Sequence, residues 1–295
     1  MPDEEPAPAS PSHAPSAQSP GTAPPPVGTG LPMAWQPFTI RGVAAFARAP
    51  LRRLLIVQAL IAFAAAIALA WFLYHAWFPS VLEAIRRLPD EGVIEGQRLV
   101  SGSAGFMMQV DGRHLGFVVD TGGDNRATLT SDVRVEFLVH GLRICSLLGC
   151  WPLPYPAGWR IQFNRPELEP LWGAWQPIIL GLEILIAPCL LLLTWAALAT
   201  CYCPFVWLIG YFNDRHLTLA GSWRLAGASL MPGALIMIAA ILAYGAGALD
   251  LLRMLVVTTF HLLVPWPYLI LAPLTLPLIP RTQRPSANPF GSATA

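Results

Sequence analysis

The sequence predicts an integral membrane α-helical bundle of four transmembrane helices, with a small extracytoplasmic α+β domain between helices 1 and 2. Hydrophobic residues make up 55% of the 295 residues and charged residues only 12%, whereas soluble domains carry about 25% charged residues. Long apolar stretches lie on either side of a central segment that holds 20 of the 35 charged residues. The composition therefore excludes an ordinary cytosolic enzyme.

The net charge and the residue types present exclude several further classes of function. The formal net charge of +1 gives no electrostatic basis for binding nucleic acid. All 18 basic residues are arginine, which excludes a lysine nucleophile, a Schiff base or a phosphate-loop lysine. The sequence contains no Gly-rich phosphate loop, no zinc-protease helix and no Gly-x-Ser-x-Gly motif, so we expect no cofactor.

The N-terminal segment, residues 1–40, is predicted to be a disordered, Pro-rich cytoplasmic tail. Eleven prolines fall within residues 1–37, among Ala, Ser, Gly and Thr. Such a composition buries too little apolar surface to offset the entropy cost of folding. A plain spacer is favoured over a docking ligand for a proline-reading domain.

The first transmembrane helix is predicted at residues 54–74. Only Gln58 is polar in this stretch, which as a helix would be about 31 Å long and would cross the hydrocarbon core. A cleaved signal peptide is disfavoured because the leader before it is long and Pro-rich. Basic residues before the helix and aromatic residues at its far end place the N-terminus in the cytoplasm. These residues are Arg41, Arg48, Arg52 and Arg53, and then Trp71, Tyr74 and Trp77.

Residues 75–173 are predicted to form the extracytoplasmic α+β domain. A short amphipathic helix is expected to begin near Ser80, which has capping-box spacing to Glu83. Short runs rich in strand-forming residues follow, and turn residues such as Asp111-Gly112 separate them. The predicted strands are residues 97–100, 106–110, 115–120, 133–140, 142–147 and 160–163.

Three more transmembrane helices are predicted at residues 178–200, 225–249 and 254–279. Pro204 is expected to end the second helix, leaving residues 201–224 as a cytoplasmic interfacial segment and loop. Residues 280–295 are expected to be a cytoplasmic tail. Four spans keep the arginines of these two segments inside, whereas five spans would place them outside. We therefore expect a multi-pass protein of the bacterial inner (cytoplasmic) membrane with both termini in the cytoplasm.

Three segments carry a resemblance to a known family: residues 81–88, the strand end at residues 117–122, and residues 217–232 before the third span. With one N-terminal span, an extracytoplasmic domain and three clustered spans, the chain resembles uncharacterised bacterial membrane proteins of the domain of unknown function 1189 type, which are distantly Yip-like. That family has no established activity, so the resemblance implies a topology rather than a chemistry. The Pro-rich N-terminus and the Cys145–Cys150 pair depart from it.

Asp120 is the sharpest catalytic candidate, since Val118-Val119-Asp120-Thr121-Gly122 resembles the signature of retropepsin-type aspartic proteases. That chemistry needs two carboxylates that share a proton, and the sequence has a single Asp-Thr-Gly. Activity would therefore require a dimer. The favoured interpretation is a strand end that turns through glycines, with Asp120 bonded to its own backbone. No other catalytic residue is assigned.

Cys145 and Cys150 are predicted to form a disulfide. They lie in a hairpin-like segment of the predicted extracytoplasmic domain, where an oxidising compartment favours the bond. Two free thiols are the alternative. Cys201 and Cys203 lack the further ligands that a structural zinc ion needs, so no metal is expected.

Glu183 and His261 are predicted to form an intramembrane polar pair. Counted from Trp175 and Met254 at the outer ends of their helices, they lie at nearly the same depth, eight and seven residues in. A carboxylate that faced lipid alone would be costly, so it should turn inward to a partner or to water, or stay protonated. A hydrogen bond that fixes helix rotation is favoured over a proton-linked or ligand-sensing pair.

Three classes of function follow. The favoured one is a non-enzymatic membrane scaffold or binding module whose periplasmic domain binds a protein partner or a ligand. The second is a small transporter or channel subunit that uses Glu183, and the third is a membrane-tethered aspartic protease that uses Asp120. The expected partners are the lipid bilayer and a protein bound through the extracytoplasmic domain. Small residues in the third span, such as Gly227 and Gly233, leave a homo-oligomer open.

Overall fold

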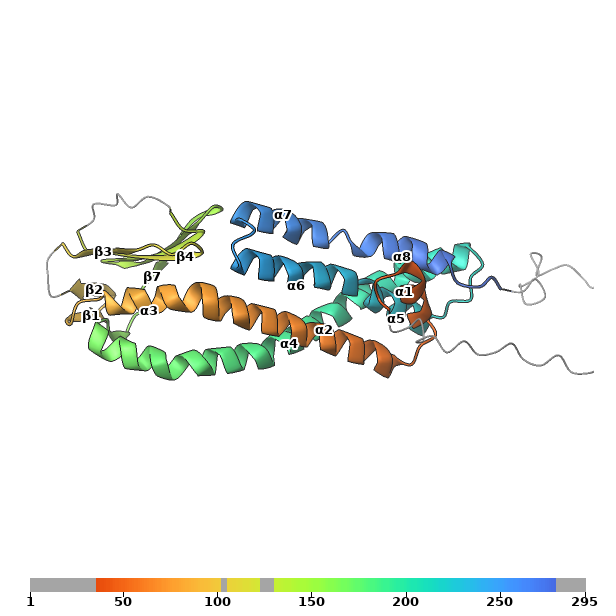
Figure 1. The fold of residues 1–295 in the computed structure, drawn as a ribbon, viewed down its shortest axis with the longest axis horizontal. Helices are drawn as coiled ribbons and strands as arrows, with labels where there is room; N and C mark the ends of the chain where they lie inside the picture. Colours follow the sequence, from red (N-terminus) through yellow and green to blue (C-terminus); the bar gives the residue numbers. More distant parts are fainter. Residues whose placement is uncertain (1–35, 102–104, 123–129, 280–295) are drawn as a thin grey trace, which may run out of the picture. The chain divides into compact units, whose positions relative to one another are not determined.

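The computed structural model describes residues 36–101, 105–122 and 130–279. Within these residues, four helical stretches are long and apolar enough to cross a membrane (Figure 1). The predicted tails at residues 1–40 and 280–295 lie almost entirely outside the described residues. The four stretches are Leu51–Arg86, Arg165–Phe212, Leu219–Gly245 and Leu251–Leu274.

The first stretch runs beyond its predicted end. Helix α2 (Leu51–Phe72) continues through a π-helical turn, η2 (Leu73–Trp77), into α3 (Phe78–Arg86). The separate helix start expected at Ser80 is absent, because α3 follows η2 directly and its N-cap position, Trp77, is itself helical and makes no side-chain cap. His75 lies within η2, and its Nδ1 is 3.0 Å from the Trp71 carbonyl oxygen one turn earlier, so this polar side chain faces the helix's own backbone and does not end the helix.

The second stretch is α4 (Arg165–Phe212), a single helix of 48 residues and thus about 72 Å long. The break expected at Pro204 does not occur. Proline removes one backbone hydrogen bond, but α5 packs along this part of α4 and the helix continues through Pro204. Cys203 Sγ approaches the Leu219 carbonyl oxygen at 3.5 Å, and Gly210 lies against the side chain of Leu217.

The third and fourth stretches are each made of two helices. Helix α5 (Leu219–Ser229) is followed directly by α6 (Met231–Gly245), whereas a short turn at residues 262–264 separates α7 (Leu251–His261) from α8 (Pro265–Leu274). Asp250 caps α7 by accepting a hydrogen bond from the Arg253 amide at 2.7 Å. Pro265 occupies the first turn of α8, where its missing N–H has no helical partner to lose.

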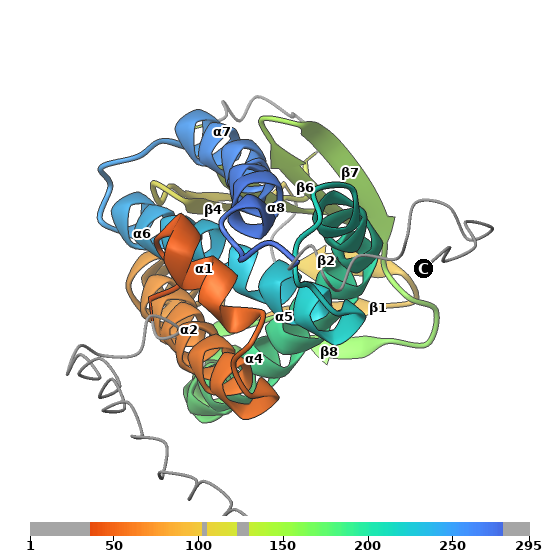
Figure 2. The same ribbon diagram turned by 90° about the vertical axis from the view of Figure 1, so that its right-hand side faces the viewer.

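A short helix that the sequence analysis did not predict, α1 (Ile40–Phe46), precedes the first stretch. Thr39 caps it by accepting a hydrogen bond from the Gly42 amide at 3.0 Å. Phe46 is fully buried in one apolar core together with side chains of α2, α4, α5 and α8. Figure 2 shows the helices end-on, with α1 beside α5. The segment before the first long helix is therefore part of the helical bundle.

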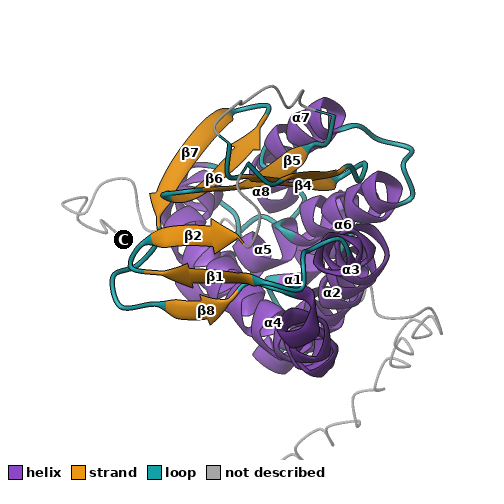
Figure 3. Ribbon diagram, turned by 90° about the vertical axis from the view of Figure 1, so that its left-hand side faces the viewer, coloured by secondary structure: helices purple, strands orange, loops and turns teal. Residues whose placement is uncertain are grey.

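Between η2 and α4 lies the inserted domain, which consists of α3 and eight strands in two sheets (Figure 3). The smaller sheet has the order β2-β1-β8, and the larger has the order β3-β4-β5-β6-β7 with β4 and β5 parallel. The strands are β1 (Gly92–Glu95), β2 (Arg98–Ser101), β3 (Met107–Val110), β4 (Leu115–Asp120), β5 (Val133–Leu138), β6 (Gly141–Ser146), β7 (Gly149–Pro154) and β8 (Arg160–Gln162).

The core of the inserted domain lies where α3 meets both sheets. Ala84 of α3 and Leu88, just after its end, pack with Ile94 of the smaller sheet and Met108 and Val119 of the larger one. The amphipathic pattern that predicts this helix therefore marks the face that it buries. Strands β1 and β7 were not among the predicted strands.

Candidate functional site

An apolar groove of about 290 Å³ opens in the inserted domain, between α3 and the five-stranded sheet. Val81 and Ile85 lie one turn apart on α3, so both side chains point to the same side of the helix. Phe117 of β4 and Leu142 of β6 face them from the sheet. The other lining residues are also apolar or aromatic: Ala84, Leu88, Ile94, Met108, Val119, Phe137, Tyr155, Trp159, Ile161, Phe163 and Leu168.

Tyr155 is the tyrosine among the residues that line this groove, and its hydroxyl is already hydrogen-bonded within the protein. Its hydroxyl donates a hydrogen bond to the Leu138 carbonyl oxygen at 3.0 Å. Burial raises the pKa of Tyr155 to about 12, so the hydroxyl stays protonated and keeps donating at neutral pH. The groove therefore offers carbon surface rather than hydrogen-bonding groups, and it suits an apolar ligand.

The inserted domain is joined to the helices by a buried polar cluster. The Tyr244 hydroxyl, on α6, donates to Asp132 Oδ2 at 2.7 Å. His114 Nδ1 lies 3.0 Å from the same oxygen, and the His114 and Tyr244 rings are 4.4 Å apart between centroids. We call these three residues the junction cluster. It connects a loop next to β4 and a loop next to β5 with the end of α6.

Arg113 adds a second connection beside the junction cluster. Its guanidinium donates to the Gly247 carbonyl oxygen at 2.7 Å, between α6 and α7. Gly247 has a φ of +79°, and a Cβ at this position would lie 2.1 Å from Arg113 Nη1. The positive φ favours glycine here, and a side chain at this position would displace the Arg113 guanidinium.

Asp120 lies at the end of β4 and is buried. Its carboxylate accepts a hydrogen bond from the Gly122 amide at 2.9 Å, and the Thr121 hydroxyl donates to the Phe106 carbonyl oxygen at 3.1 Å. These are the bonds of a turn at a strand end. Asp120 is thus bonded to the backbone of its own turn, and both interpretations of Asp-Thr-Gly stay predictions.

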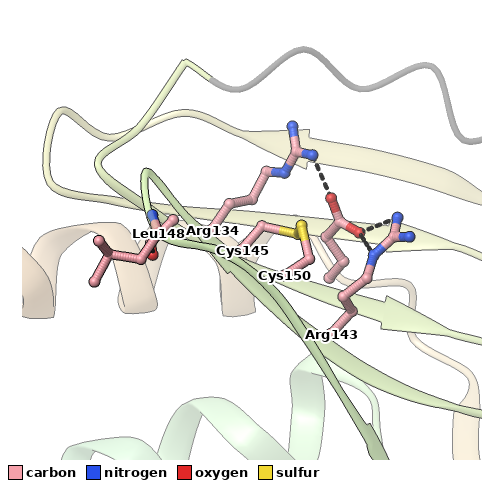
Figure 4. Close-up of a disulfide and its surroundings, with 7 residues drawn as sticks. Arg134, Arg143, Cys145, Leu148 and Cys150 are labelled. Atoms are coloured by element: carbon pink, nitrogen blue, oxygen red, sulfur yellow. Dashed lines mark hydrogen bonds and ion pairs between the residues drawn. A yellow bond between two sulfur atoms is a disulfide. The ribbon is translucent and has the colours of Figure 1, made fainter.

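Cys145 and Cys150 are joined by a disulfide across the β6–β7 hairpin (Figure 4). The two residues face each other in the antiparallel register. Close to the bond, the Glu136 carboxylate of β5 is 1% exposed and forms ion pairs with Arg134 and with Arg143 of β6. This triad and the disulfide together connect β5, β6 and β7.

Glu183 and His261 do not form the predicted pair. His261 Nδ1 instead faces the Thr258 carbonyl oxygen of its own helix at 2.5 Å. The two carboxylate oxygens of Glu183 are buried and have no hydrogen-bond partner among the described residues. Depth counted along the sequence takes no account of helix rotation or local turns, and the chain turns between α7 and α8 just after His261.

His261 lines a cavity of about 450 Å³ between α2, α4, α6 and the α7–α8 turn. Ala187 of α4 lines the same cavity, and Glu183 precedes it by one helical turn on the same side of α4. Gly233 and Ala234 of α6 leave room for it because they lack large side chains. Glu183 and His261 therefore lie near one cavity without meeting.

The groove and the junction cluster are the features that the sequence did not reveal. The α3 side of the groove has a local signal, the spacing of Val81 and Ile85. The junction cluster has none, because Tyr244 and Asp132 are 112 positions apart.

No family model, no curated protein and no solved structure matches the chain. The resemblance to the domain of unknown function 1189 type stays a prediction. The function is therefore argued from the groove, the junction cluster and the helical cavity alone.

Proposed function

We propose that the protein is a non-enzymatic membrane module whose extracytoplasmic domain binds the apolar chain of a lipid-like molecule. The apolar groove between α3 and the five-stranded sheet carries this proposal, because its lining is apolar and its one phenol is engaged by Leu138. Each methylene group that enters such a groove contributes about 0.8 kcal/mol of hydrophobic free energy. A ligand with an extended hydrocarbon part is the class that gains most there.

The proposed topology places the groove just outside a bacterial inner membrane, with both chain termini in the cytoplasm. Arginines before α2 and after α4 support this orientation by the positive-inside rule. The junction cluster supports a mechanical role, since it bonds the ligand-binding domain to α6 instead of leaving it on a loose tether. Occupancy of the groove would then bias how the domain sits on the bundle.

Photo-crosslinking tests the proposal in vesicles that contain the full chain and a diazirine-bearing fatty acid. We expect cross-links in the groove-lining segments around Val81–Leu88 and Tyr155–Phe163, in addition to those in the membrane helices. Ile85→Glu should reduce the groove cross-links severalfold, because it places a charge at the apolar wall. The matched control is Leu82→Glu on the same helix, since Leu82 does not line the groove.

Cross-links in the membrane helices serve as the internal reference. Lipid binding in the groove would be refuted if Ile85→Glu and Leu82→Glu reduced the groove cross-links equally. It would also be refuted if the cross-link yield in the groove did not exceed that in exposed strands. In that case the groove would be a surface for apolar side chains of a protein partner.

A small transporter or channel subunit is the second candidate, and one observation favours it. The chain breaks between α7 and α8 beside a cavity lined by His261, and broken helices often form transport sites. Proton flux in liposomes that disappears in Glu183→Gln would support this function. The control is Glu169→Gln, because Glu169 lies on the same helix but forms an exposed ion pair with Arg86.

A further inference from the structure

The tip of the β6–β7 hairpin is apolar and exposed. Leu147 and Leu148 form the turn and are 56% and 68% exposed, and Trp151 on β7 is exposed as well. Exposed apolar side chains in adjacent positions at a loop tip are unusual for a surface that meets only water. Something apolar should cover them.

The position of the tip indicates what covers it. Leu147 lines a shallow hollow together with Asp250, Leu251 and Leu252 at the start of α7. The stretch from α7 to α8 has 24 residues, or about 36 Å, close to the thickness of a bilayer. The start of α7 is therefore at the membrane boundary if this stretch spans the membrane.

The apolar surface of the tip continues onto α7. Leu252 and Val256 are 62% and 61% exposed and belong to a helix that is apolar enough to cross a membrane. Lipid is the partner that would cover both surfaces at once, whereas a protein partner at the tip would have to displace lipid from α7.

We infer that the β6–β7 hairpin tip inserts Leu147 and Leu148 into the outer interface of the bilayer, as a second membrane contact of the extracytoplasmic domain. This inference rests on the proposed membrane topology. The partner is the lipid surface itself, and the contact fixes the height of the domain above the membrane.

The hairpin is built for this contact. The disulfide between Cys145 and Cys150 closes the hairpin immediately behind the turn, which keeps the tip in one conformation. The Leu148 amide donates to Ser146 Oγ at 3.2 Å, so this backbone group does not enter the interface without a partner. Gly149 supplies the positive φ, +120°, that the turn requires.

Site-specific fluorophores in vesicles test the inference with the full chain. The background carries alanine at the three free cysteines, Cys189, Cys201 and Cys203. Single cysteines at Leu148→Cys, Leu153→Cys and Val256→Cys are labelled with an environment-sensitive dye without a reducing agent. Lipids with a nitroxide near the headgroup end of the acyl chain then act as quenchers.

We expect quenching at position 148 to be comparable to that at position 256, and severalfold stronger than at position 153. Leu153 is the matched control, because it is also exposed, at 45%, on β7 but lies about 16 Å along the hairpin from the tip. Quenching at 256 but not at 148 overturns the hairpin inference and leaves the membrane topology intact. Absence of quenching at 256 overturns both.

Discussion

At the scale of single residues, the inserted domain buries charged side chains as well as apolar ones. Glu136 is the clearest case, because its carboxylate pairs with Arg134 on the same strand and with Arg143 on the next one. Removing the acid from a buried ion-pair network leaves positive charge with less compensation, which costs more than the network contributes when it is intact.

Glu136→Ala should therefore lower the free energy of unfolding by about 3 kcal/mol. Denaturant unfolding of the purified protein in detergent measures this. The control is Glu83→Ala, because the Glu83–Arg87 pair is exposed on α3 and its loss should cost about 0.5 kcal/mol or less. Equal effects of the two substitutions would mean that the triad is not buried.

Tyr155 makes the stability of the inserted domain depend on pH in the alkaline range. Its pKa is raised from 10.0 to about 12 in the folded protein, so the folded state holds the proton more tightly than the unfolded state. The stability from this group is complete below pH 10 and is lost as the pH rises toward 12. Tyr155→Phe should therefore lose less stability than the wild type over this range.

Thermal unfolding at a series of pH values compares the two proteins. Below pH 10 the variant should be less stable by about 1 kcal/mol, since it lacks the hydrogen bond to Leu138. Tyr74→Phe serves as the control at an exposed site. If both variants follow the wild type between pH 10 and 12, Tyr155 is not the group that titrates.

At the scale of elements, the β6–β7 hairpin is held by two constraints, the strand register and the disulfide. Closing so short a loop stabilises the domain by about 2 kcal/mol. Replacing Cys145 and Cys150 together by serine should soften the hairpin but leave the other strands paired.

Thiol labelling of intact spheroplasts checks this bond. In the wild type, Cys145 and Cys150 should react only after a reducing agent has been added. Labelling of both without reduction would show that the bond is absent in the cell. The other cysteines act as the reference for labelling of the bundle.

The sequence predicted elements better where polar turn residues separate them. Strands β4 and β6 lie close to their predicted bounds, since Asp-Gly and Gly-rich turns mark their ends. Strand β7 was missed because Pro152 and Pro154 argue against a strand, yet an edge strand tolerates proline. At Pro204 the error was the reverse: the proline predicted the end of a helix that in fact continues. An apolar helix that packs along a neighbour tolerates the loss of one hydrogen bond.

The candidate site was predictable only in part, for a related reason. The pattern of α3 indicates an apolar face, but it does not show that Phe117 and Leu142 leave a groove against that face. The pairing of Glu183 with His261 rested on residue counts alone, which do not show that the His261 ring faces the Thr258 carbonyl oxygen of its own helix. Side-chain convergence between distant segments has no local signal.

At the scale of the whole molecule, the junction cluster decides whether the inserted domain and the helices behave as one body. Tyr244→Phe removes the hydrogen bond to Asp132 and should cost about 1.5 kcal/mol of docking free energy. We expect faster amide hydrogen exchange in residues 111–116 and 246–250, on both sides of the contact.

Exchange in β5 and β6 should not change in this variant, because their hydrogen bonds belong to the sheet. The control is Tyr211→Phe, at an exposed position at the far end of α4. Unchanged exchange on both sides of the contact in Tyr244→Phe would mean that the cluster does not hold the domain.

The pairing of β1 with β8 also determines when the inserted domain can finish folding during protein synthesis. These strands are the first and the last of the domain, and Ile94 faces Ile161 in their register. In the proposed topology, a nascent chain cannot complete the small sheet until residues 160–162 have left the ribosome and the translocation channel, when α4 is already following. Because domains generally fold as units, closure of the domain and insertion of the second long helix would be closely coupled in time in the proposed topology. A slow step at either should therefore delay the other.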